Sequence, residues 1–349
     1  MSYRSGVVAA DFHPDTRAFF ARRSVLVLGG SGFIGSHVVE QLLQLGARVR
    51  VLARAPAPPF LAAVRSEVDL KVGDLRSLDE ARAAVRGQDV VLNLAARVAG
   101  IEFNKSHPAS MFMDNMELFF VALQAAAEAK VERFLVTSSA CVYPRICTIP
   151  TPESEGFRDE PEPTNRGYGW AKRMEEMLGA AAAVEFGIPV AIARPYNAYG
   201  PRDDFDPATS HVLPALIRKA LAAKDGTFPV WGDGSHSRSF LYVDDFARGL
   251  LEVAARHPVA QAINIGTAEE TTIRAAAELI AGIASEMTGR TTRPVFDPSG
   301  ITGQPRRACD TGLAQSLLGF EARVPLAAGL RRTMQWYLDH ENCPRPADA

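Results

Sequence analysis

The chain has few cysteines, few tryptophans, almost no net charge and no long apolar run. Its 349 residues include four cysteines and three tryptophans, and the formal net charge is −2. No apolar segment approaches the roughly 18 residues of a membrane-spanning helix, so we expect no membrane partner. The near-neutral charge argues against a nucleic acid as partner. Residues 1–23 lack the apolar core of a signal peptide, and we expect a cytoplasmic protein.

None of the four cysteines has metal-ligand spacing, so we expect no metal site and reduced thiols. Cys141 differs from the others because it lies two residues past Ser139, at the end of an apolar run. That run, residues 133–137, predicts a buried parallel strand, and ligands bind at such strand ends in open α/β sheets. A thiol there can serve as a base for proton transfer at carbon. The other three cysteines are Cys147, Cys309 and Cys343.

Apolar runs alternate with helical periodicity over the first half of the chain. We expect strands at residues 24–28, 49–52, 70–72, 90–95, 133–137 and 190–193. We expect helices from a glycine-rich turn to about residue 45, over 108–129 and over 168–186. Alternating strands and helices predict an α/β fold, here a Rossmann-type doubly wound parallel sheet.

After Arg194 the pattern changes to loops, short strands and helices near residues 212–223, 246–255, 273–286 and 326–338. This change predicts a smaller, discontinuous α/β lobe that closes over the edge of the sheet. The expected division has an N-terminal extension at 1–23, a dinucleotide-binding domain at 24–193 and 236–266, and a substrate-binding lobe at 194–235 and 267–349.

A glycine-rich turn follows the first predicted strand. Gly29 permits a tight turn, Gly32 lets the backbone approach a pyrophosphate, and Gly35 lets the helix pack close to the strand. The phosphates would lie at the helix N-terminus, beside Phe33 and Ile34, where free N–H groups and the helix dipole favour an anion. With a strand before it and a helix after it, the turn predicts a dinucleotide cofactor.

The end of the second strand bears on the choice between NADP and NAD. NAD sites usually carry Asp or Glu there to bond the ribose 2′-hydroxyl, but this stretch reads Leu-Ala-Arg and ends at Arg54. Arg54 could pair with a 2′-phosphate or be a solvated surface residue, so NADP is favoured and NAD remains the alternative. Asp74 and Leu75, after the third strand, and Ala95, after the fourth, are further candidates for the cofactor site. We expect His37 on the solvent face of the helix after the turn.

Tyr168 and Lys172 share one helix face, because side chains four residues apart are neighbours. A cationic Lys172 would favour the phenolate and lower the pKa of Tyr168 from about 10 towards neutrality. Tyr168 could then exchange a proton with an alcohol or ketone oxygen while a hydride moves at carbon, and Ser139 would hold the same oxygen. With the glycine-rich turn, these three residues predict a dehydrogenase or reductase.

These motifs carry a resemblance to a known family. The chain from about residue 24 to 338 resembles the extended short-chain dehydrogenase/reductases and, more narrowly, the GDP-L-fucose synthases. Those enzymes are NADPH-dependent 3,5-epimerase/4-reductases acting on GDP-4-keto-6-deoxymannose. The resemblance is densest at residues 139–144, 162–165, 197–207, 210–218, 230–234 and 303–307.

The resemblance implies further roles. Cys141 and His211 match the family's cysteine and histidine, which move protons at C3 and C5 on either side of a C4 ketone. The residues implied to bind the GDP-sugar substrate are Asn197, Arg218, Trp231, Arg238 and Arg306. The family also implies a homodimer formed through the two long helices.

Two positions point to different members of the family. Ala140 stands where fucose synthases usually carry serine, and Ser-Ala-Cys resembles the GDP-mannose 3,5-epimerases, which oxidise C4 and reduce it again with a retained NAD. Those epimerases usually carry a lysine at the position of His211, which favours the synthase. We therefore expect a synthase-like enzyme, with the redox-neutral epimerase as the alternative and a catalytically silent dinucleotide-binding scaffold as the remote one.

Overall fold

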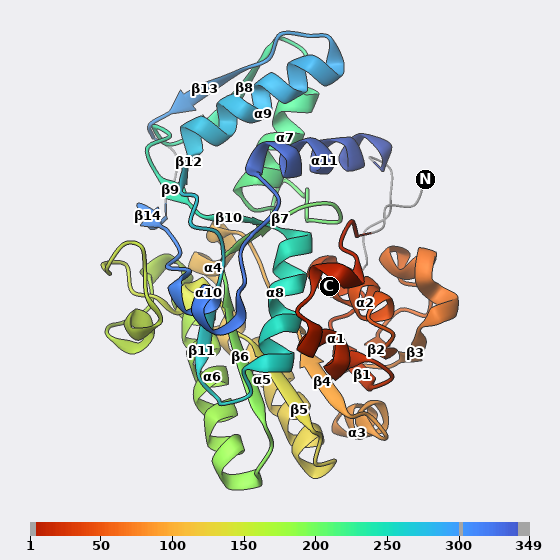
Figure 1. The fold of residues 1–349 in the computed structure, drawn as a ribbon. Coiled ribbons are helices and arrows are strands. Elements are labelled where there is room, and N and C mark those ends of the chain that lie inside the picture. Colours follow the sequence, from red (N-terminus) through yellow and green to blue (C-terminus); the bar gives the residue numbers. More distant parts are fainter. Residues whose placement is uncertain (1–4, 300–302, 341–349) are drawn as a thin grey trace.

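Seven parallel strands form the central sheet (Figure 1). The computed structural model describes residues 5–299 and 303–340, so Cys343 lies outside the described residues. The strand order is β11 (Ala262–Ile265), β6 (Val190–Pro195), β5 (Arg133–Thr137), β4 (Val90–Asn93), β1 (Ser24–Leu28), β2 (Arg48–Ala53), β3 (Asp69–Val72). The strand order reverses at β1, which lies between β2 and β4, and ligands bind at such a point in open sheets. The predicted α/β class is confirmed.

Helices cover both faces of the sheet because successive strand residues point to opposite sides. Val25 and Val27 of β1 pack into one core, and Leu26 and Leu28 pack into the other. The first face is covered by α1 (Pro14–Phe20), α2 (Phe33–Gln44), α8 (Val243–Arg256) and α10 (Gly312–Leu318). The second is covered by α3 (Leu78–Val85), α5 (Pro108–Glu128) and α6 (Arg166–Phe186).

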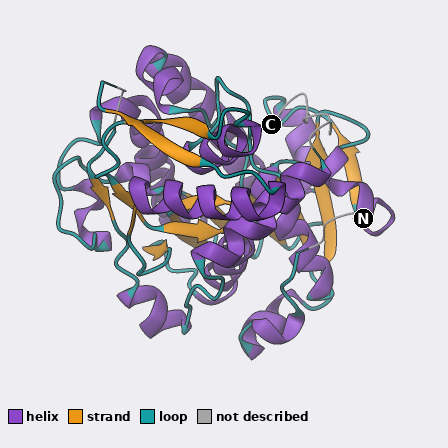
Figure 2. Ribbon diagram, turned by 90° about the horizontal axis from the view of Figure 1, so that it is seen from above, coloured by secondary structure: helices purple, strands orange, loops and turns teal. Residues whose placement is uncertain are grey.

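A smaller lobe with its own apolar core lies beyond the carboxyl end of the sheet (Figures 1 and 2). Its helices are α7 (Val212–Ala222), α9 (Ile273–Thr288) and α11 (Leu326–Asp339). Its strands form small sheets from β8 (Thr227–Trp231) with β13 (Arg293–Asp297), and from β12 (Thr271–Thr272), β9 (Ser237–Arg238) and β14 (Arg306–Arg307). A third pair, β7 (Asn197–Tyr199) with β10 (Phe240–Tyr242), connects the lobe to the main sheet.

Short helices complete the chain. They are α4 (Ile101–Ser106) and the 3-10 helices η1 (Ala9–Asp11), η2 (Pro59–Glu67), η3 (Ala140–Val142), η4 (Glu153–Phe157) and η5 (Pro163–Asn165). The one that matters most for function is η3, because it places Cys141 immediately beyond the carboxyl end of β5.

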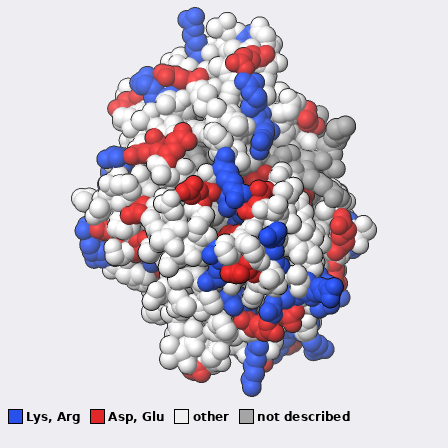
Figure 3. Space-filling model, viewed as in Figure 1, with Lys and Arg blue, Asp and Glu red and all other residues white. Residues whose placement is uncertain are grey.

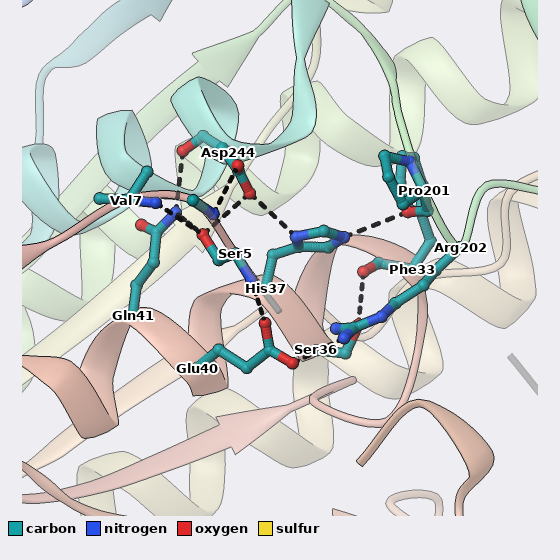
Figure 4. Close-up of polar contacts among 11 residues, drawn as sticks. Ser5, Val7, Phe33, Ser36, His37, Glu40, Gln41, Pro201, Arg202 and Asp244 are labelled. Carbon is teal, nitrogen blue, oxygen red and sulfur yellow. Dashed lines mark hydrogen bonds and ion pairs between the residues drawn. The ribbon is translucent and has the colours of Figure 1, made fainter. Parts of the chain in front are cut away.

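A buried polar network attaches the N-terminal segment to the rest of the molecule (Figure 4). Ser5 donates through its hydroxyl to Asp244 Oδ1 (2.9 Å) and through its backbone N–H to Glu40 Oε2 (2.7 Å). His37 is fully buried, with Nδ1 3.1 Å from Asp244 Oδ1 and Nε2 3.1 Å from the carbonyl oxygen of Pro201. The predicted solvent exposure of His37 was wrong, because the N-terminal segment and α8 cover this side of α2.

Charges of both signs are interspersed on the face shown in Figure 3. This mixed surface agrees with the small net charge of the sequence. Among the described residues, no helix combines the length and apolarity needed to cross a bilayer. Within the same residues, no group of three or more His, Cys, Asp or Glu side chains is placed to hold a metal ion.

Candidate active site

The glycine-rich turn joins β1 to α2 at the point where the strand order reverses. Gly29 has a φ of +76°, and a Cβ there would lie 2.8 Å from the carbonyl carbon of Leu94. A Cβ on Gly35 would lie 2.0 Å from the carbonyl oxygen of Gly29, so both positions require glycine. Gly32 precedes α2, and no acidic side chain lies in the first turn of that helix. The turn therefore leaves the first N–H groups of α2 available to an anion.

The other predicted cofactor residues follow the carboxyl ends of β2, β3 and β4. Arg54 is exposed directly after β2, and no carboxylate stands at this strand end. Asp74 accepts the N–H of Arg76 (2.9 Å), while Leu75 is buried in the core. Ala95 lies against Gly29. An arginine in the place of the usual acid at this strand end suits a 2′-phosphate better than a 2′-hydroxyl, so this set of residues fits NADP.

Ser139, Cys141 and Tyr168 meet where η3 packs on the start of α6. The Ser139 hydroxyl oxygen accepts the N–H of Cys141 (3.1 Å), and the same hydroxyl is hydrogen-bonded to Tyr168. Gly169 makes this contact possible, because a Cβ there would lie 2.5 Å from the carbonyl oxygen of Cys141. The structure thus brings together the predicted serine, thiol and phenol.

The pKa of Tyr168 departs from its ordinary value in the direction opposite to the prediction. Burial raises it well above 10, the charges of Cys141 and Glu175 raise it further, and the hydrogen bond with Ser139 opposes them. Lys172 does not offset this rise, because its Nζ lies 2.9 Å from Glu175 Oε2 and 5.5 Å from the centre of the Tyr168 ring. Tyr168 therefore keeps its proton at neutral pH and can act as an acid.

Glu175 is a residue that the sequence interpretation did not single out. The side chains of Lys172 and Glu175 are 3% and 2% exposed. Burial raises the pKa of Glu175 to about 7, although the charge and the hydrogen bond of Lys172 lower it. The one available signal was spacing, because residues three apart on a helix are neighbours.

His211 lies immediately before α7, with its side chain accessible to solvent. Desolvation by the neighbouring protein lowers the pKa of His211, the charge of Asp204 raises it, and the charge of Arg307 lowers it. Most of the His211 imidazole is therefore neutral at pH 7, and the protonated fraction grows as the pH falls. The cation near Cys141 is an arginine rather than an imidazolium.

The parallel pairing of β14 with β9 sets the direction of the arginines near Cys141. Arg307 pairs in register with Arg238, and paired residues lie on the same side of a sheet. Arg307 Nη1 lies 3.6 Å from Cys141 Sγ. Arg306 instead donates two hydrogen bonds to Glu270 (2.9 and 2.7 Å). Arg306, which the resemblance implies for the GDP-sugar, thus does not contact the thiol. The contact is made by the next residue, Arg307.

Arg238, which the family resemblance implies for the substrate, lies near Cys141 and Arg307. Burial lowers the pKa of Arg238 to about 9, Arg307 lowers it further, and Cys141 raises it, so all three groups share one neighbourhood. Asn197 donates to the carbonyl oxygen of Ser239 (3.0 Å), the residue that follows Arg238, and pairs in register with Phe240. The other two predicted substrate residues lie in the small lobe: Arg218 in α7 and Trp231, 52% exposed, at the end of β8.

Comparisons with known proteins find a matching family model and similar sequences. Residues 25–266 match the family model described as NAD dependent epimerase/dehydratase family. The chain is 33% identical over 340 residues to the probable GDP-L-fucose synthase 1 of Oryza sativa subsp. japonica, covering 96% of this chain and 97% of that protein. It is 33% identical over 330 residues to the dTDP-4-dehydro-6-deoxy-D-allose reductase of a Streptomyces species, covering 92% and 98%.

A solved structure shares the architecture of both the sheet and the small lobe. The crystal structure of a GDP-L-fucose synthetase from Naegleria fowleri bound to NADP superposes with a TM-score of 0.75 at 26% identity. The match covers 93% of this chain and 95% of that one.

Proposed function

The chain belongs to the NAD dependent epimerase/dehydratase family, and we propose that it catalyses NADP-dependent 3,5-epimerisation and 4-reduction of a GDP-4-keto-6-deoxy sugar. The observation that carries the proposal is the grouping of Ser139, Cys141 and Tyr168 around one turn. A C4 ketone acidifies the C–H bonds beside it and needs a proton on its oxygen when reduced. A thiol for the first task and a phenol for the second stand together here.

Epimerisation requires a base on one face of the sugar ring and an acid on the other. We assign Cys141 and His211 to this pair. Removal of a proton beside the ketone gives an enolate, and the return of a proton to the opposite face inverts the carbon. His211 is an exposed residue, so its imidazole can take a proton from water and deliver it to the carbon in its protonated form.

Reduction requires a proton at the C4 oxygen while C4 accepts a hydride. NADPH supplies that hydride when it is bound. Tyr168 donates the proton, and Ser139 holds the oxygen by a hydrogen bond. The raised pKa of Tyr168 supports net reduction, because the redox-neutral cycle that Ala140 suggested must begin with Tyr168 as a base that takes a proton from a C4 hydroxyl.

We assign the remaining residues to the two ligands. Those that would hold NADP are Gly29, Gly32, Phe33, Ile34, Gly35, Arg54, Asp74, Leu75, Ala95, Tyr168 and Lys172. Those that would hold the GDP-sugar are Asn197, Arg218, Trp231, Arg238 and Arg306. Arg306 would exchange Glu270 for phosphate on binding. In this proposal residues 24–193 and 236–266 serve the cofactor, and residues 194–235 and 267–349 serve the substrate.

We also propose that two copies of the chain associate through α5 and α6. The two helices lie side by side (Figure 1), and apolar side chains such as Met113 and Val184 are exposed on them, at 67% and 89%. Exposed apolar surface of this kind marks protein interfaces. The free thiols Cys141, Cys147 and Cys309 suit a reducing compartment such as the cytoplasm.

The test is to incubate the protein with GDP-4-keto-6-deoxymannose and NADPH in heavy water. We expect NADPH oxidation together with deuterium at C3 and C5 of the product. If NADPH is not consumed but GDP-mannose exchanges at C3 and C5, the enzyme is the redox-neutral epimerase. If NADPH binds and neither signal appears, the chain is a scaffold and both catalytic assignments are wrong.

A variant separates the two chemical steps. Cys141→Ser should lower deuterium exchange at C3 and C5 by at least a hundredfold, while NADPH binding, followed by fluorescence titration, stays unchanged. Persistence of the exchange would mean that Cys141 only packs against Tyr168.

A further inference from the structure

A thiol can act as a base only after it has lost its own proton, so the site needs a group that stabilises the thiolate. This inference rests on the proposed function, in which Cys141 removes a proton from the sugar. Its partner His211 does not carry a fixed positive charge, because desolvation and the charge of Arg307 lower the pKa of His211, although Asp204 raises it. The stabilising charge must therefore come from elsewhere.

We propose that Arg307 is a positioning residue that holds Cys141 in its thiolate form. Arg307 Nη1 donates to Cys141 Sγ across 3.6 Å, a contact within hydrogen-bonding reach of sulfur. A guanidinium is charged at neutral pH. A fixed cation at this distance favours the charged form of the thiol over the neutral one.

Arg307 is held in this position by Gln304. Gln304 is 2% exposed, and its carbonyl oxygen accepts Arg307 Nε at 2.9 Å. Its amide nitrogen donates to the carbonyl oxygens of Pro144 (3.1 Å) and Arg145 (3.4 Å). These two residues follow the Cys141 turn, so one amide connects the guanidinium to the turn that carries the thiol.

The sheet register separates Arg307 from its neighbour. Arg307 lies in register with Arg238 on β9, on the side that faces Cys141, whereas Arg306 points to Glu270. Two adjacent arginines in the sequence thus have different surroundings. Arg306 is 58% exposed at its side chain, while Arg307 is 8% exposed.

Charged and titratable groups face Cys141 from three elements. Arg307 comes from β14, Arg238 from β9 and Tyr168 from α6. Of these, Arg307 is the one with a direct contact to the sulfur, and Tyr168 keeps its proton at neutral pH. Removing the charge of Arg307 should therefore change the protonation of the thiol more than any other single change on these elements.

The experiment measures the alkylation of Cys141 by iodoacetamide as a function of pH in the full-length protein, without substrate. The rate at the Cys141 peptide is followed by mass spectrometry, with the Cys147 peptide as an internal reference. We expect Arg307→Gln to move the midpoint of the rate profile up by at least one pH unit and to slow alkylation at pH 7 about tenfold. Arg306→Gln, the matched control, should leave the profile where it is in the wild type.

Arg307→Lys provides a second variant if Arg307→Gln does not fold. A single ammonium cannot keep both the Gln304 oxygen and the sulfur in contact, so we expect a midpoint between those of the wild type and the glutamine variant. The proposal is overturned if the folded variants alkylate with the wild-type profile, or if Arg306→Gln shifts the profile as far as Arg307→Gln. Iodoacetamide needs no sugar nucleotide, so this experiment is independent of the proposed function. A shifted profile supports the role of Arg307 even if GDP-4-keto-6-deoxymannose is not the substrate. An unshifted profile contradicts that role even if the enzyme turns over that sugar.

Discussion

Glu175 determines how Lys172 acts on Tyr168. A lone ammonium would stabilise the phenolate, whereas an ammonium paired with a buried carboxylate contributes little net charge. Lys172 donates to Glu175 (2.9 Å) and to the carbonyl oxygen of Thr137 (3.0 Å), so its charge is balanced and its position fixed. This arrangement suits a tyrosine that gives its proton to a ketone.

We expect Glu175→Gln to reduce the fraction of Tyr168 that is protonated at high pH. Without the carboxylate, Lys172 lowers the pKa of Tyr168, and reduction requires the protonated phenol. The basic limb of the pH profile of kcat/KM for NADPH oxidation should move down by about one unit, the size of shift that one nearby charge gives. In the wild type, Glu175 gains a proton as the pH falls through about 7, so the variant resembles the wild type at low pH. Glu185→Gln, an exposed change on the same helix, is the control, and an unmoved basic limb would contradict the role of Glu175.

The sequence identified residue types and spacings, but not the direction in which side chains point. Tyr168, Lys172 and Ser139 could be predicted because helix and strand periodicity place them. The contact of Arg307 with the thiol could not, because it depends on the register of β14 against β9. The raised pKa of Tyr168 could not be predicted from the sequence either, because it reflects burial and a lysine whose charge is already paired.

At the scale of elements, apolar periodicity predicted the strands and long helices well. The strand expected at 24–28 is β1 itself, and the helix expected at 108–129 is α5, with bounds Pro108–Glu128. The six-residue α4 and the 3-10 helix η2 were not predicted, because segments this short have too few turns to show a period. The prediction therefore worked where one element buries a continuous apolar face.

The exposed faces of α5 and α6 lead to a prediction about assembly. A groove of about 520 Å³ lies between them, lined by residues that include Phe112, Met113, Trp170 and Met174. We expect the wild type to sediment as a dimer at micromolar concentration. Met113→Glu should raise the dimer dissociation constant about tenfold to a hundredfold, because burying a methionine is worth roughly 1.5–3 kcal/mol.

The control for this prediction is an exposed apolar residue elsewhere. Val259 is 56% exposed in the loop after α8, so Val259→Glu should leave the sedimentation coefficient unchanged. A monomeric wild type, or equal dissociation constants for the two variants, would contradict association through α5 and α6.

At the scale of the whole molecule, Asp244 joins parts of the chain that lie far apart in sequence. It accepts the Ser5 hydroxyl and the N–H of Gly6 (3.1 Å), and it contacts the ring of His37 (Figure 4). These partners lie 239, 238 and 207 positions away, and no local pattern reports such contacts. His37 in turn meets the carbonyl oxygen of Pro201 (3.1 Å), so the network connects the cofactor helix to the loop that leads into the small lobe.

We expect Asp244→Asn to lower the free energy of unfolding by about 2–3 kcal/mol at pH 7, the cost of disrupting a buried charged hydrogen-bond network. Burial alone would raise the pKa of Asp244, but the hydrogen bonds from His37, Ser5 and Gly6 and the charge of His37 lower it below 3.8. A carboxyl with a lowered pKa in the folded state stabilises the fold above its unfolded value and loses that contribution as the pH falls through the folded value. The difference in the free energy of unfolding between variant and wild type should therefore be constant from pH 7 to 5 and shrink below about pH 4.

Urea unfolding followed by circular dichroism measures this free energy. The control is Asp11→Asn, which breaks the exposed pair with Arg323 and should lower the free energy of unfolding by less than about 1 kcal/mol. Equal losses for the two variants would mean that the N-terminal segment only covers the sheet and that Asp244 does not hold the molecule together.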